Sequence, residues 1–99
     1  MIEPRQVEPA TFEAVKLALR ITSMAFDDEI TLIILAGLQD LTNAGVTNTA
    51  QTDSLILRAL TIYAKGHFGF NDDSEKFIKS YEMLKISLSL AGDYIGAVG

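Results

Sequence analysis

The sequence predicts an all-α fold, a small bundle of four main helices with a long link between helices two and three and an extended N-terminal arm. Three observations support it. Apolar residues recur at intervals of three and four in four segments, carboxylates gather where these segments begin, and glycines stand where several end. A chain of 99 residues suffices for one hydrophobic core, so we expect a single domain over residues 1–99.

The first helix is expected at Phe12–Arg20, after an extended arm. Residues 1–10 contain both prolines, Pro4 and Pro9, which favour an arm outside the helices. Thr11 is the candidate N-cap. Apolar side chains then follow at helical spacing: Phe12, Val15 and Leu19.

The second helix is expected to begin at the acidic run Asp27–Glu29, with Asp27 as its cap, and to stop at Gly45. Because Leu32 and Leu35 fall outside the main apolar face, the helix is apolar over much of its circumference. We therefore expect it at the centre of the core. The main face consists of Ile30, Ile33, Ile34, Gly37, Leu38 and Leu41.

A polar, threonine-rich link, Asn43–Asp53, leads to the third helix, which starts near Thr52 or Asp53 and ends around Gly66 to Gly69. The link is either a mobile solvated loop or a loop that inserts into a partner. One face of the third helix is apolar and consists of Ile56, Ala59, Leu60, Tyr63 and Ala64.

The fourth helix is expected to be capped by Asp72, with Glu75 three residues later as in a capping box. Before it, Gly66 and Gly69 are expected to supply the left-handed conformation of a sharp turn, and Phe68 and Phe70 to plug the end of the bundle. The packing seam of the fourth helix is Phe77, Tyr81, Leu84, Leu88 and Ala91.

Composition argues against most chemical functions. The net charge is −5, and Lys and Arg are scattered singly, so generic nucleic-acid binding is disfavoured. There is no cysteine, and His67 is the single histidine, so neither a thiolate nor a His-His metal set exists. The acidic runs sit where helix N-termini favour negative charge, which explains them without catalysis. We expect no enzyme activity, no cofactor, no metal site and no membrane span.

Three stretches of the sequence follow a recognisable pattern. Residues 15–21, VKLALRI, match the phrase VKxxLRI and precede the acidic helix start Asp27–Glu29. Residues 59–69, ALTIYAKGHFG, and 77–90, FIKSYEMLKISLSL, resemble AIxxYVKxxFG … FxxSYExLKxxLSL. In their order and spacing these phrases are similar to those of the head-tail connector (adaptor) proteins of long-tailed bacteriophages. The likeness spans Phe12 to Tyr94, nearly the whole chain.

The resemblance implies a structural virion protein, not an enzyme, that forms a homo-oligomeric ring beneath the portal protein and presents a surface to a head-completion, stopper or tail protein. DNA would pass through the ring without sequence-specific binding, and an acidic lining would let it slide. The protein would be made in the bacterial host cytoplasm and end at the head-tail interface of the virion. The alternative is a small helical DNA-binding regulator of a prophage.

The patterned residues of the family phrases are candidates for oligomer or partner contacts. They are Arg58, Tyr63, Lys65, Phe68, Tyr81 and Glu82. The arm around Arg5, the Asn43–Asp53 link and the tail Asp93–Gly99 lie outside the predicted helices, so we expect them to become ordered on assembly.

Overall fold

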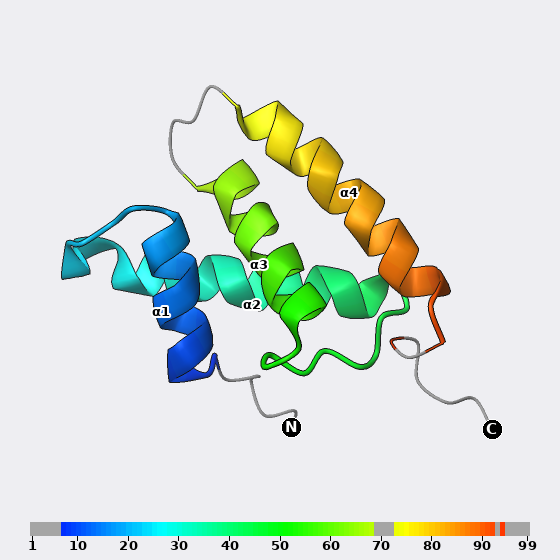
Figure 1. The fold of residues 1–99 in the computed structure, drawn as a ribbon. Coiled ribbons are helices and arrows are strands. Elements are labelled where there is room, and N and C mark those ends of the chain that lie inside the picture. Colours follow the sequence, from blue (N-terminus) through cyan, green and yellow to red (C-terminus); the bar gives the residue numbers. More distant parts are fainter. Residues whose placement is uncertain (1–6, 69–72, 93, 95–99) are drawn as a thin grey trace.

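The computed structural model describes residues 7–68, 73–92 and 94, and within them the fold is all-α. The elements in order are α1 (Pro9–Ala18), the short 3₁₀ helix η1 (Met24–Phe26), α2 (Asp27–Asn43), α3 (Ser54–His67) and α4 (Ser74–Leu90) (Figure 1). The predicted small helical bundle is therefore confirmed.

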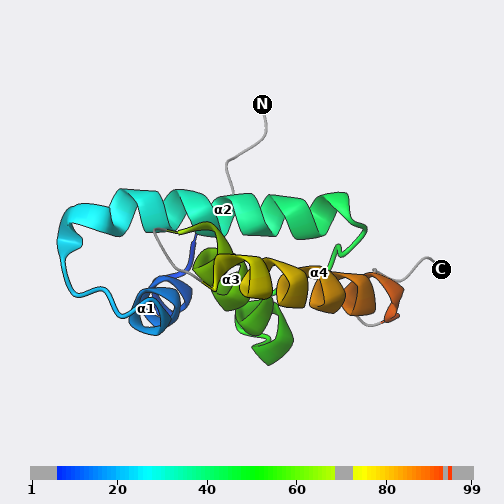
Figure 2. The ribbon, with the colours of Figure 1, turned by 90° about the horizontal axis from the view of Figure 1, so that it is seen from above.

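The helices form two layers, with α2 lying across one side and α1, α3 and α4 on the other (Figure 2). The central helix is α3, because it packs against α1, α2 and α4. The expectation that α2 would be central was wrong. Its predicted apolar face is buried except for the partly buried Ile33, but Leu32 on its outer side is 65% exposed, so α2 has an apolar residue that faces outward.

The core is built mainly from α2 and α3, with single contributions from α1 and the long link. Its fully buried aliphatic residues include Val15 of α1 and Val46 of the link. Among its largest members is Tyr81 of α4, which is 1% exposed. The other buried apolar residues are Ile30, Ile34, Leu38, Leu41, Ile56, Ala59, Leu60, Ala64 and Leu88.

The first helix begins earlier than predicted. Pro9 is its first residue and Glu8 its N-cap, whereas Thr11 is buried inside the helix and does not cap it. Proline suits the first helical position because its fixed φ is helical and its missing N–H would have no partner there. The expected arm therefore ends before Pro9, and residues 1–6 lie outside the described part of the chain.

Asp27 is not a cap either. The η1 turn runs directly into α2, so Phe26 occupies the N-cap position and Asp27 is already helical. The Asp27 carboxylate instead accepts a 2.7 Å hydrogen bond from Lys16 Nζ, which ties α1 to the start of α2. The negative charges of the first turn still complement the helix dipole.

The predicted stop of α2 at Gly45 is confirmed. Gly45 has a φ of 99°. Its N–H donates to the Thr42 carbonyl at 3.0 Å, and the Val46 N–H donates to the Leu41 carbonyl at 2.9 Å. These two bonds form a Schellman motif. Arg20 makes the corresponding turn after α1 with a φ of 62°, a conformation that costs a non-glycine residue energy.

The long link is held against the helices rather than projecting from them. Val46 is fully buried, and Gln51 is 7% exposed and accepts a 2.9 Å hydrogen bond from the Glu8 N–H through Oε1. The N–H groups of Thr47 and Asn48 donate to the Tyr94 carbonyl at 2.8 and 3.0 Å. These contacts anchor the link at several points, while most of its residues remain exposed to solvent; whether it is mobile or inserts into a partner stays a prediction.

The third helix starts where predicted, and Asp53 caps it by accepting hydrogen bonds from the N–H groups of Leu55 and Ile56 at 2.8 and 3.2 Å. The N-cap position of α4 is held by Asp73. The predicted cap Asp72 lies outside the described residues, as do Gly69 and Phe70.

Gly66 has a different role from the one predicted. It lies inside α3 and is buried, and its φ is not left-handed. A Cβ atom there would stand 2.8 Å from Ile78 Cγ1 and 3.3 Å from the Ile78 backbone nitrogen. Gly66 is therefore required because α4 approaches the backbone of α3 closely, not because the chain turns there.

We predict that Gly66→Ala lowers the free energy of unfolding by about 1 to 3 kcal/mol, because the added methyl group overpacks the α3–α4 contact. The direction of this change in stability is informative, because alanine normally stabilises a helix interior relative to glycine. Urea unfolding measures the effect, with Gly92→Ala as the control because nothing lies within 4 Å of its added Cβ. Equal stability of Gly66→Ala and the wild type would contradict the close approach.

We predict opposite effects at the two left-handed positions. Arg20→Gly should raise the free energy of unfolding by about 0.5 to 1 kcal/mol, because relief of the strained φ exceeds the entropic cost of glycine. Gly45→Ala should lower it by about 1 kcal/mol through backbone strain alone, since nothing lies within 4 Å of the added Cβ. Thermal unfolding that ranks the two variants the other way would refute this reading of both turns.

Candidate functional site

A groove with a volume of about 440 Å³ runs between α3 and α4 on the molecular surface. Its apolar lining includes Leu57, Ile62 and Phe77, and two cations, Arg58 and Lys65, border it. Lys65 Nζ lies 5.4 Å from the centroid of the Phe77 ring. None of the described lining residues is acidic, and neither cation forms an ion pair with a described residue. We call this feature the α3–α4 groove.

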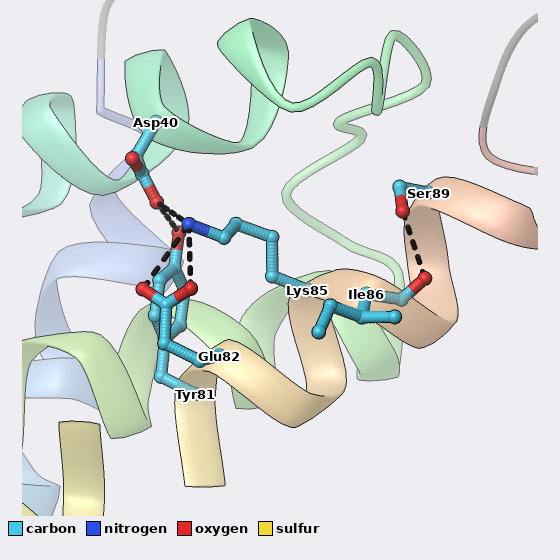
Figure 3. A network of polar contacts seen from close by, with 6 residues as sticks. All are labelled: Asp40, Tyr81, Glu82, Lys85, Ile86 and Ser89. Atoms are coloured by element: carbon cyan, nitrogen blue, oxygen red, sulfur yellow. Dashed lines mark hydrogen bonds and ion pairs between the residues drawn. The ribbon is translucent and has the colours of Figure 1, made fainter. Parts of the chain in front are cut away.

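A polar network joins α2 to α4 on another side of the molecule (Figure 3). The Tyr81 hydroxyl donates to Asp40 Oδ2 at 2.5 Å, and Lys85 Nζ donates to the same oxygen at 3.0 Å. Lys85 also pairs with Glu82 Oε1 at 3.0 Å. Tyr81 and Lys85 are four residues apart on α4, so both reach Asp40 from one helix face.

The network shifts the ionisation of its members. Burial alone would raise the pKa of Asp40, but the hydrogen bonds from Tyr81 and Lys85 hold that pKa below its ordinary value of 3.8. Burial and the Asp40 carboxylate raise the pKa of Tyr81 above its ordinary value. The pKa of Lys85 is raised by Glu82 and Asp40 against the opposing effect of burial. At neutral pH the arrangement is a charge-assisted clamp between two helices, with a tyrosine that stays protonated.

Aromatic side chains continue the packing from this network toward the end of α3. The Tyr63 ring lies edge to face with Tyr81, with centroids 4.9 Å apart. His67, in the last turn of α3, stacks on Tyr63 with centroids 4.1 Å apart. Phe68 meets Phe26 edge to face at 5.7 Å. His67 therefore packs against its own chain at the end of α3.

The six candidate contact residues therefore divide into two groups. Arg58 and Lys65 point into the groove, and Glu82 is exposed but paired with Lys85. Tyr63, Phe68 and Tyr81 contact other parts of their own chain. Whether any of the six contacts a partner stays a prediction. Asp40 and Lys85 were not predicted as site residues, because the sequence shows only the spacing of Tyr81 and Lys85 and not their partner on α2.

Two further surface features contain apolar side chains that are exposed to solvent. On α4, Met83, Ile86 and Leu90 are 71%, 56% and 78% exposed and follow one another at helical spacing. At the junction of η1 and α2, Met24 is 78% exposed, the first turn of α2 carries the exposed carboxylates Asp28 and Glu29, and Leu32, one turn after Asp28, is 65% exposed. We name the first the α4 stripe and the second, Met24–Asp28–Glu29–Leu32, the acidic corner.

The described residues offer little for metal or membrane chemistry. No group of three His, Asp or Glu residues in that part of the chain is placed to hold a metal ion. Over the same residues, no helix is both long and apolar enough to cross a membrane. What the surface does offer is a basic groove, an acidic corner and an apolar stripe, all features suited to contacts with other macromolecules.

The Asp40 network yields a testable stability effect. Tyr81→Phe should lower the free energy of unfolding by about 1 to 2 kcal/mol at neutral pH, because it removes a hydroxyl that donates to a carboxylate. The matched control Tyr63→Phe should change it little, since Tyr63 donates no hydrogen bond to a described residue.

The same network sets a pH dependence. Because the folded-state pKa of Asp40 is lowered, its stabilising effect is present above pH 3.8 and is lost as the pH falls below that value. The disadvantage of Asp40→Asn relative to the wild type should therefore shrink between pH 7 and pH 2 in urea titrations. A constant difference between the two proteins across that range would contradict the shift.

Comparison with known proteins gives the family. No match was found among curated proteins or among solved structures. A sequence model of the family described as "Phage connector protein" matches residues 11–95, which includes all four α-helices except the first two residues of α1. Such a match implies a structural role in the virion and contacts with other head or tail proteins of a phage. The chain belongs to the phage connector protein family.

Proposed function

We propose that this protein forms a homo-oligomeric ring at the head-tail junction of a phage, between the portal protein and a tail-completion protein, and that the ring continues the DNA channel. The observation that carries the proposal is the family match over residues 11–95. Family membership supports the connector role. The ring, its place between two other proteins and the DNA channel are the parts that we propose.

The surface of the folded chain supports this step. A ring subunit needs two unlike lateral surfaces, because each copy meets its two neighbours through different sides. It also needs surfaces for proteins above and below. The acidic corner, the α3–α4 groove and the α4 stripe are three distinct surfaces of differing chemistry. A chain that functioned as a monomer would gain nothing from the exposed Met83, Ile86 and Leu90.

The charge of the chain supports the passage of DNA. The net charge is −5. Of the described basic residues, Lys16 and Lys85 are engaged in ion pairs. A chain in which carboxylates outnumber cations does not retain phosphates, so duplex DNA can move past it.

The proposal is tested by the mass in solution. Light scattering over a concentration series, with negative-stain imaging of the largest species, should show closed rings with a central hole wide enough for duplex DNA. If the isolated protein is a monomer, the same measurement in the presence of the portal protein of its phage should give the ring on the portal. A monomer under both conditions would refute the proposal.

A second measurement separates the connector from a DNA-binding regulator. Duplex DNA at physiological ionic strength should leave the electrophoretic mobility and the mass of the protein unchanged, because the channel surface repels phosphate. A stable dimer that binds duplex DNA with a steep salt dependence would overturn the proposal in favour of a regulator.

A further inference from the structure

We propose that the α3–α4 groove of one copy receives the acidic corner of a second copy, and that this head-to-tail contact is the lateral contact of the ring. The inference rests on the proposed function, because it names the surfaces through which the subunits meet. It is carried by the charges, apolar side chains and positions of the two features.

The groove has the chemistry of a receptor for an acidic, partly apolar segment. Its floor is apolar through Leu57, Ile62 and Phe77, and Arg58 and Lys65 border it. The two cations lie seven residues apart on α3, so they stand on one face of the helix about 10 Å apart along its axis. In an acidic protein, two cations that have no ion-pair partner among the described residues mark a surface suited to carboxylates.

The acidic corner has the complementary chemistry. Asp28 and Leu32 are four residues apart on α2 and share a face, and Glu29 stands beside them. Met24 and Leu32 expose 78% and 65% of their surfaces. Asp27 is paired with Lys16, whereas Asp28 and Glu29 form no ion pair with a described residue. The corner therefore offers two carboxylates and two apolar side chains to a neighbour.

The two features lie on opposite sides of the subunit. Leu60 and Tyr63 of α3 face α2, since they are the side chains that a Cβ on Gly37 would meet. Arg58 and Lys65 stand roughly 150° around α3 from Leu60, given 100° per residue. The groove residues of α3 thus lie on the side of that helix away from α2, which forms the other layer of the fold (Figure 2). The corner faces out from that layer.

Charge decides against a symmetric pairing. Two grooves placed face to face would bring Arg58 and Lys65 of both copies together, and two corners would bring four carboxylates together. A groove against a corner pairs opposite charges and covers apolar surface on both copies. Such a contact is heterologous, and repetition of it produces a ring when the rotation closes.

Cysteine crosslinking tests the contact directly, and the chain has no native cysteine to give a background. In the double variant Ser80→Cys/Met24→Cys, with one thiol in the groove and one at the corner, a short bis-maleimide should produce a ladder of crosslinked oligomers. Each single variant should remain uncrosslinked, and a mixture of the two should stop at the dimer. Because crosslinking traps weak contacts, absence of the ladder at high protein concentration would overturn the inference.

Charge reversal provides the second test. Arg58→Glu/Lys65→Glu should raise the concentration for half-assembly at least about tenfold, because it opposes like charges across the contact. Asp28→Lys/Glu29→Lys should do the same. The variant that carries all four substitutions restores opposite charges and should assemble again. Lys79→Glu, a single charge reversal on an exposed α4 position outside the groove, should assemble as the wild type does.

The outcomes separate the inference from the proposed function. Rings that form without the crosslinked ladder, or that resist both charge reversals, would refute the groove-corner contact and leave the ring intact. Loss of assembly in Lys79→Glu with normal assembly in Arg58→Glu/Lys65→Glu would place the lateral contact near the α4 stripe and also refute the inference. Absence of any ring, with or without the portal protein, would instead refute the proposed function.

Discussion

The close approach of three helices at α3 is the constraint on which the rest of the structure depends. Two glycines permit it, one where α2 meets α3 and one where α3 meets α4. Gly37 of α2 leaves space for Leu60 and Tyr63, 3.1 Å from the position of a Cβ atom, and Gly66 of α3 leaves space for Ile78 of α4. With α2 and α4 held this near, Tyr81 reaches Asp40 and buries its ring against Tyr63. The polar clamp therefore follows from the packing and does not create it.

This packing also determines which surfaces remain outside. When α3 turns Leu60 and Tyr63 toward α2, its opposite side, with Arg58 and Lys65, must face away from that layer. When α2 buries Ile30, Ile34 and Leu41, its first turn presents Asp28 and Glu29 outward. A groove of one charge and a corner of the other are thus placed on different sides by the same helix contacts that make the core.

The sequence predicted the four helices, most of the buried faces of α2 and α3, the start of α3 near Asp53 and the stop at Gly45, because residue spacing and the residues that end a helix are local properties. It did not predict that Thr11 is internal and that Asp27 pairs with Lys16, because each depends on where another segment begins or packs. Glycine was expected to matter at position 66, but it is needed there because Ile78 of α4 approaches closely. Such a contact between helices cannot be predicted from the residues on either side of Gly66. For the same reason Asp40 escaped notice, since its partners Tyr81 and Lys85 are more than 40 residues away.

The distribution of apolar residues connects the fold to the family role. The chain is 48% hydrophobic, and much of the apolar surface that the core does not bury lies on α4 and at the start of α2. Leu32 lengthens the apolar circumference of α2 without entering the core, and Met83, Ile86 and Leu90 do the same on α4. The apolar residues outside the main face of α2 led to the wrong expectation that this helix lies at the centre of the core. They instead indicate a surface that a neighbouring protein can cover. A helix that is apolar on two sides has one side for its own chain and one for a neighbour, as a connector subunit requires.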